Sequence, residues 1–171
     1  MTASDDFTSE TDAPAPRATD LSLSVANEQS HVTFDIETLT RISTSLLRDE
    51  GVPLAEISLA IVDDATIHAI NRQYLNHDCP TDVISFLLSE PNDDGVTPPM
   101  DVMEGEIVIS GETAARVAGE MGCPPHEELA LYLVHGLLHL CGYDDQTPAD
   151  RETMQSRERV HLQKFGIEPH Y

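Results

Sequence analysis

The chain has 171 residues, which suits one domain of ordinary size and is too short for two comfortable ones. It holds 31 Asp and Glu against 9 Lys and Arg, a formal net charge of −22 at pH 7, which disfavours broad electrostatic binding to nucleic acid or anionic membranes. No apolar run approaches the roughly 20 residues that span a bilayer, and the first residues lack the basic and apolar stretches of a secretory signal. We therefore expect a cytoplasmic protein, and the 3 cysteines, an odd number at irregular spacing, argue against a disulfide framework.

The N-terminal segment differs in composition from the rest of the chain. Residues 1–20 hold five acidic residues, two Pro and only one large apolar residue, Phe7. Such a segment has too little apolar surface to offset the entropy that is lost on ordering. We therefore predict a disordered acidic tail over 1–20 and a single folded domain over 21–171.

Strand and helix patterns alternate through this domain. Leu21, Leu23 and Val25, for example, alternate with small residues, which is the period of a half-buried strand. The predicted elements are, in chain order, a strand over 21–26, a helix from a cap at Thr33 or Asp35 to about 48, a strand over 56–62, a helix capped by Asp63 and Asp64 to about 75, a turn over 76–81, a strand over 83–88, a loop over 91–100, a strand over 105–110, and helices over 111–121, over 126–141 and from Thr147 to about 165. This order predicts an α+β domain, with a small mixed β-sheet of about four strands and helices packed on its faces.

The most informative stretch lies in the apolar helix predicted over 126–141. His135 and His139 are four residues apart, so their side chains share one helix face and can reach one metal ion. Gly142 permits a left-handed turn that reverses the chain, and Asp145 can then return toward both histidines as a third ligand. Three protein ligands and an open position are typical of a catalytic zinc site, in which the metal lowers the pKa of its water toward ~7.

A plainer alternative is a pair of partly buried histidines without a metal. It would leave the ring nitrogens without partners in apolar surroundings, which is unfavourable, so we prefer the metal site. Zinc proteases of the H-E-x-x-H type have their general base directly after the first histidine. Gly136 stands there in this chain, and Glu127 and Glu128 come two helical turns before His135, so a protease would need its base from elsewhere.

Three motifs, in the same order, resemble those of one known family. They are NRQYLNHDCPTDVISF at 71–86, GEIVIS at 105–110 and HGLLHLCGYDD at 135–145. The first contains a P-T-D-V-x-S-F core, the second is similar to G-D-I-x-I, and the third is similar to H-G-x-L-H-L-x-G-Y-D-H. These are the patterns of the YbeY-type endoribonucleases, a family of rRNA maturation factors.

The resemblance implies a mixed sheet of about four strands, a single metal ion in a cleft, usually zinc, and cleavage of single-stranded RNA in ribosome biogenesis. We therefore predict a metal-dependent endoribonuclease in which zinc on His135, His139 and Asp145 is the catalytic group. The expected partner is RNA, as an rRNA precursor or in the ribosome, and neither DNA nor a membrane. Two alternatives stay open: a zinc metalloprotease-like hydrolase on the same ligands, and a non-enzymatic ribosome assembly factor whose metal is structural.

Two positions depart from the family pattern. Asp145 stands where the family has His, and a carboxylate oxygen can also bind zinc. Asp144 matches the family's own Asp, and it could instead be the third ligand or the hydrogen-bond partner of a histidine. Leu75 stands where many members have an Arg suited to phosphate, which leaves Arg72 as a nearby substitute.

Other candidates depend on fewer observations. Thr81, Asp82 and Ser85 match the family segment and are candidates for the cleft, although Thr-Asp before a strand is also a common turn. Four of the 9 basic residues fall in the last predicted helix: Arg151, Arg157, Arg159 and Lys164. They could form a basic face for RNA. Because Glu152 and Glu158 are interleaved with them, and because cations near a helix C-terminus suit the helix dipole, we favour a purely structural role.

Overall fold

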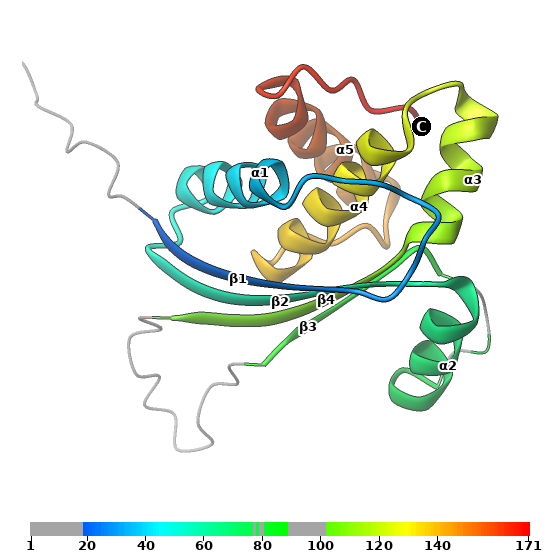
Figure 1. Ribbon diagram of the computed structural model, residues 1–171. Coiled ribbons are helices and arrows are strands. Elements are labelled where there is room, and N and C mark those ends of the chain that lie inside the picture. Colours follow the sequence, from blue (N-terminus) through cyan, green and yellow to red (C-terminus); the bar gives the residue numbers. More distant parts are fainter. Residues whose placement is uncertain (1–18, 77, 79–80, 89–101) are drawn as a thin grey trace, which may run out of the picture.

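A four-stranded mixed sheet forms the centre of the computed structural model, which describes residues 19–76, 78, 81–88 and 102–171. Its strands are β1 (Asp20–Asn27), β2 (Leu54–Val62), β3 (Val83–Leu87) and β4 (Met103–Ser110). The spatial order is β1-β2-β4-β3, in which β1, β2 and β4 are parallel and β3 is antiparallel to β4 (Figure 1). The predicted mixed sheet is thus confirmed.

Helices cover both faces of this sheet, unequally. They are α1 (Ile36–Asp49), α2 (Asp64–Tyr74), α3 (Gly111–Met121), α4 (Pro125–Leu140) and α5 (Pro148–Gln163). Of the described helices, α2 alone lies on one face, near one end of the strands, whereas the other four form a layer on the opposite face (Figure 1). Within the described part of the chain, the predicted elements are confirmed in order and approximate bounds. Of the two caps considered for α1, Asp35 is the one found, and its carboxylate accepts a hydrogen bond from Thr38 N at 2.9 Å.

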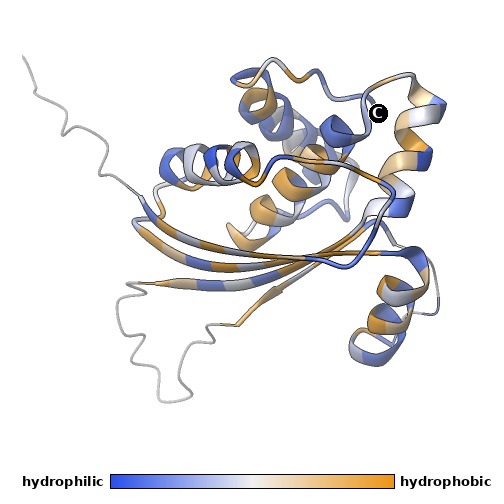
Figure 2. Ribbon diagram, viewed as in Figure 1, coloured by the Kyte–Doolittle hydropathy of each residue, from blue (hydrophilic) through white to orange (hydrophobic). Residues whose placement is uncertain are grey.

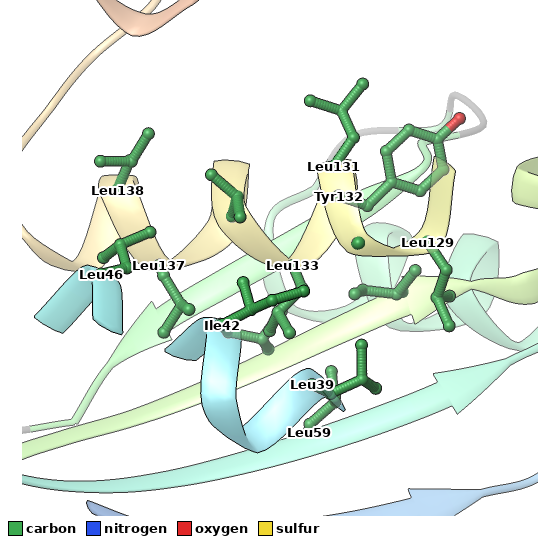
Figure 3. Close-up of a cluster of buried hydrophobic side chains, with 14 of the residues drawn as sticks. Leu39, Ile42, Leu46, Leu59, Leu129, Leu131, Tyr132, Leu133, Leu137 and Leu138 are labelled. Carbon is green, nitrogen blue, oxygen red and sulfur yellow. The ribbon is translucent and has the colours of Figure 1, made fainter. Parts of the chain in front are cut away.

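Helix α4 occupies the middle of the helical layer. It is apolar on nearly all sides, and such a helix is stable only where other elements cover it. Figure 2 shows the hydrophobic colouring of α4 between the sheet and the mostly hydrophilic α5. Leu133 and Leu137 of α4 lie beside Ile42 and Leu46 of α1, above Leu59 of β2 (Figure 3). Burial of each such side chain stabilises the fold by about 2 kcal/mol, so the position of α4 is firmly fixed.

The central strand β2 shows how the sequence period assigns side chains to the two faces. Ile57, Leu59 and Ile61 are buried under the helical layer, whereas Glu56 and Ser58, which alternate with Ile57 and Leu59, are exposed on the other face. A strand places successive side chains on opposite faces, which is why the alternation is this regular. The helices α1, α4 and α5 therefore share one continuous core with β2.

Two residues at the end of the predicted tail contact the domain. Asp20 is the first residue of β1, and Thr19 Oγ1 donates a hydrogen bond to Val52 O at 2.8 Å. The rest of the predicted acidic tail, residues 77, 79 and 80 of the predicted turn over 76–81, and the predicted loop over 91–100 lie outside the described residues. Among the described helices, none is long and apolar enough to cross a membrane.

Candidate metal centre

Two histidines of α4 meet at their Nε2 atoms. His135 and His139 lie one turn apart, as their spacing predicts, and both are partly buried. Their Nε2 atoms are 2.9 Å apart, and the rings are nearly perpendicular with centroids 4.5 Å apart. Both nitrogens are therefore directed at one point beside the helix.

The chain reverses after α4 and returns an acid to that point. Gly142 has φ of 96°, a left-handed conformation that favours glycine, as the sequence predicts. The Asp145 carboxylate then lies 3.8 Å from His135 Nε2 and 3.9 Å from His139 Nε2. Asp144 is exposed, and its Oδ1 accepts a hydrogen bond from Asp145 N at 2.8 Å. Asp145, and not Asp144, thus faces the histidines, while Asp144 shapes the turn.

These three side chains form a group that could hold a metal ion. One ligand atom from each of His135, His139 and Asp145 lies within 4.8 Å of the other two. A metal ion bound at about 2 Å from each donor would require only such a spacing and small side-chain adjustments. The sequence-predicted triad is therefore brought together by the fold.

The Nδ1 atoms of both rings have hydrogen-bond partners. His135 Nδ1 lies 2.7 Å from Glu158 Oε1, and His139 Nδ1 lies 2.9 Å from the carbonyl oxygen of Tyr143. With a proton on each Nδ1, both rings donate to these acceptors and leave the Nε2 lone pairs free. Metal-ligating histidines typically have such partners, which fix the tautomer and the ring orientation.

Glu158 is the site residue that sequence reasoning missed. The sequence shows Glu158 only as an acid interleaved with the basic residues of the last helix, whereas in the structure only 3% of its surface is exposed. Its second oxygen accepts a hydrogen bond from the Tyr171 hydroxyl at 2.8 Å. A signal exists in the sequence: Met154, Glu158 and Leu162 are spaced by four residues, so Glu158 shares the apolar stripe of α5.

The surroundings of His135 are anionic. Burial by itself lowers the pKa of this ring, but the hydrogen bond and charge of Glu158, with the charges of Asp145 and Asp82, outweigh burial and raise the pKa above its ordinary value. Positive charge is therefore favoured at this ring. A divalent cation at the Nε2 atoms would meet the same favourable potential.

A cleft of about 360 Å³ opens beside the triad. His135 and Asp145 line it, together with Asp82, which directly precedes β3, and Glu128, near the start of α4. Glu128 is buried, and burial raises the pKa of its carboxyl, with a further contribution from the charge of Asp82. The family-matched Asp82 thus lies at the cleft.

Three other candidates, Thr81, Ser85 and Arg72, do not line this cleft. Thr81 Oγ1 donates to the carbonyl oxygen of Val83 at 3.2 Å, which is the turn role. Ser85 is partly buried in β3, opposite Ile107 of β4. Arg72 is exposed on α2, the helix on the other face of the sheet (Figure 1).

Comparisons with known proteins give the family. The endoribonuclease YbeY model matches residues 24–166. The chain belongs to the YbeY endoribonuclease family. Endoribonuclease YbeY of Syntrophotalea carbinolica is 43% identical over 136 residues, which are 78% of this chain and 89% of that protein. The Pelotomaculum thermopropionicum YbeY is 41% identical over 149 residues, 84% of this chain and 96% of the relative.

The comparisons also bear on fold and motifs. YbeY of Rhodopirellula baltica is 49% identical over 121 residues, 70% of this chain and 58% of that protein. The solution structure of a Thermotoga maritima protein has a TM-score of 0.55 and 20% identity, and it covers 86% of this chain and 94% of that one, which supports the fold. The resemblance inferred from the three motifs is confirmed.

Packing against the sheet explains why the YbeY motif has glycine at position 136 of this chain. A Cβ atom on Gly136 would lie 3.0 Å from Ile107 Cγ2 and 3.4 Å from Val83 Cγ2. The position after the first histidine therefore faces the sheet and not the cleft. A glutamate there, as in zinc proteases, would have to enter the core, where an unpaired charge is strongly unfavourable.

Proposed function

We propose that this chain is a metal-dependent endoribonuclease that cleaves single-stranded RNA in rRNA maturation, with one zinc ion bound by His135, His139 and Asp145. The observation behind the proposal is the convergence of these three side chains in a member of the YbeY family. RNA, as an rRNA precursor or in the ribosome, is the proposed partner. With such a substrate, we expect the protein to act in the cytoplasm.

The donor set suits zinc. Zinc accepts imidazole nitrogen and carboxylate oxygen, and catalytic zinc sites keep three protein ligands and one open position. Among the described residues, no fourth His, Cys, Asp or Glu joins the group. This supports an open catalytic site over a closed structural one, and so favours an enzyme over an assembly factor with a structural metal.

The residues around the triad would each have a defined task. When bound, a divalent ion supplies Lewis acidity, which polarises a phosphoryl oxygen and lowers the pKa of attacking water. Glu158 and the Tyr143 carbonyl keep the protons of His135 and His139 on Nδ1. Glu128, whose pKa is raised by burial, lines the cleft beside His135.

The size of the cleft supports a single-stranded substrate. A volume of about 360 Å³ is near the lower end for ligand pockets, so it admits a short part of one strand. Single strands can present unstacked nucleotides to such a cleft, whereas paired strands present a wide helical surface. The net charge of −22 further favours local contact at the cleft over contact along a broad surface.

The test compares substrates and metals with the full chain. Chelator-treated protein should cleave neither RNA nor casein, and reloading with Zn²⁺ should restore cleavage of single-stranded RNA but not of its duplex or of casein. His139→Ala should be inactive, whereas His126→Ala, an exposed histidine on the same helix, should retain activity. Cleavage of casein alone would indicate the protease alternative. A folded, zinc-loaded chain that cleaves neither substrate would indicate an assembly factor.

A further inference from the structure

The four cations of α5 and its C-terminal end differ in their partners. Three of them form ion pairs, namely Arg157 with Glu50, Arg159 with Glu168 and Lys164 with Asp49. Arg151 differs, because no carboxylate of the described residues lies within ion-pair distance of it. Its Nη2 donates a weak hydrogen bond to the backbone oxygen of Asp145 at 3.4 Å, and its side chain is otherwise exposed. Its charge is therefore not neutralised by the fold.

The position of Arg151 in its helix does not account for its positive charge either. Arg151 is the fourth residue of α5 and lies in the first turn after the cap at Thr147. The N-terminus of a helix has a partial positive charge, so a cation there is disfavoured, whereas cations at a C-terminus are stabilised. The dipole interpretation that suits cations at the end of α5 thus fails for Arg151.

Arg151 lines the same cleft as His135 and Asp145. Among the described residues that form the cleft it is the one Lys or Arg, and the acidic residues on the walls are Asp82, Glu128, Asp145 and Glu158. A polyanion that enters this cleft meets mostly acidic groups, and Arg151 supplies a compensating charge. Because it contacts the backbone of Asp145, this charge lies beside the metal centre.

We infer that Arg151 binds a phosphate group of the RNA strand next to the metal centre. This inference rests on the proposed function. A guanidinium group can donate two parallel hydrogen bonds to one phosphate, and it keeps its charge throughout the physiological pH range. An exposed arginine without an ion-pair partner breaks no ion pair when it binds a phosphate. The new contact therefore adds to the affinity for RNA.

The experiment measures cleavage of a fluorescent single-stranded RNA by the zinc-loaded full chain at several salt concentrations. Arg151→Ala should raise KM about tenfold and leave kcat within about threefold, because a contact made equally before and during the reaction affects binding alone. The slope of log KM against log salt should fall by about 0.7, the counterion release expected for one phosphate of a single strand. Arg151→Lys should restore the slope and most of the affinity.

Arg72→Ala is the matched control. It removes the same charge from an exposed helix on the other face of the sheet, so KM and its salt dependence should stay at the wild-type values. Zinc affinity should be the same in all four proteins. If Arg151→Ala keeps the wild-type KM and salt slope, or if Arg72→Ala changes them as much, the inference is overturned.

Failure of the inference and failure of the proposed function can be told apart. If the zinc-loaded wild-type chain cleaves RNA while Arg151→Ala behaves like it, only the role of Arg151 is refuted. If the wild-type chain does not cleave, the intact RNA can be used to compare the same proteins by fluorescence anisotropy. The loss of one phosphate contact in Arg151→Ala would then support Arg151 as an RNA-binding residue, and equal binding would refute it.

Discussion

Two glutamates with largely buried side chains each contact a histidine, and only one of these pairs belongs to a candidate metal centre. Glu158 Oε1 lies 2.7 Å from His135 Nδ1, and Glu50 Oε1 lies 2.9 Å from His161 Nε2. The two glutamate side chains are 4% and 9% exposed. The local geometry of the pairs is thus similar, and the difference lies in what surrounds the other ring nitrogen.

The surroundings of the two rings have opposite electrostatic effects. At His135 the free nitrogen meets a second imidazole and a carboxylate, and the pKa is raised. At His161 burial lowers the pKa; Glu50 opposes this shift, while the charges of Arg157 and Lys164 add to it. His161 Nδ1 has no hydrogen-bond partner among the described residues. A histidine–glutamate pair therefore marks a metal site only where further ligands converge on the free nitrogen.

The largest expected effect on stability concerns the pair of Glu50 and His161. Glu50 accepts hydrogen bonds from Tyr143, Arg157 and His161, and its removal leaves all three groups without this carboxylate. We expect Glu50→Ala to lower the free energy of unfolding by about 3 kcal/mol while one zinc ion per chain is retained. Urea unfolding and metal analysis measure this, with exposed Glu152→Ala as the control. Loss of the metal would show that the two regions are not separate.

The matching change at the other pair should act on the metal. Glu158→Ala leaves His135 Nδ1 without an acceptor, and loss of such a partner typically lowers metal affinity by about 10–100-fold. Competition with a zinc chelator measures the affinity, again beside Glu152→Ala. Unchanged zinc affinity in Glu158→Ala would mean that this carboxylate supports the fold and not the metal centre.

The lowered pKa of His161 predicts a dependence of stability on pH. The unfolded chain protonates this residue near its ordinary pKa of about 6.5, whereas the folded chain does so only at lower pH. Its contribution to stability is therefore present above about pH 6.5 and is lost as the pH falls, by at most about 1.4 kcal/mol per unit. Relative to His161→Gln, the wild type should lose stability between pH 7.5 and 5.5. An increase over this range would contradict the direction of the shift.

The smallest expected effect tests the link between the two regions. Tyr143 touches both, since its carbonyl accepts from His139 and its hydroxyl donates to Glu50 Oε2 at 2.9 Å. Tyr143→Phe removes the hydroxyl alone and should lower the free energy of unfolding by about 1 kcal/mol. Zinc affinity should change less than about threefold, because the contact with His139 is made by the backbone. A tenfold loss of affinity would show that Glu50 positions the metal centre through Tyr143.

The sequence was sufficient for features that depend on local spacing. The alternation in β2 and the 3.6-residue period of the helices determine the order of elements, and His135, His139 and Asp145 fall within one helix and the turn that follows. The return of Asp145 depends on a single left-handed glycine, which the sequence also indicates. Such features need no knowledge of how distant elements pack.

Partners from distant elements could not be deduced in the same way. Glu158 is 23 residues from His135, and Glu50 is more than 100 residues from its partners on α5. Their contacts arise from how α1, α4 and α5 pack, which no spacing within one helix specifies. The buried stripe of α5 is visible in the sequence, but it does not say which histidine a buried glutamate would meet.

The proposed metal centre requires that His135, His139 and Asp145 together bind one divalent ion. Calorimetric titration of Zn²⁺ into the chelator-treated full chain tests it most directly, with Asp145→Asn and Asp144→Asn as a matched pair of neighbouring substitutions. We expect one ion per wild-type chain, an affinity close to wild type in Asp144→Asn and a loss of at least about tenfold in Asp145→Asn. Zinc binding that is lost in Asp144→Asn and retained in Asp145→Asn would contradict it.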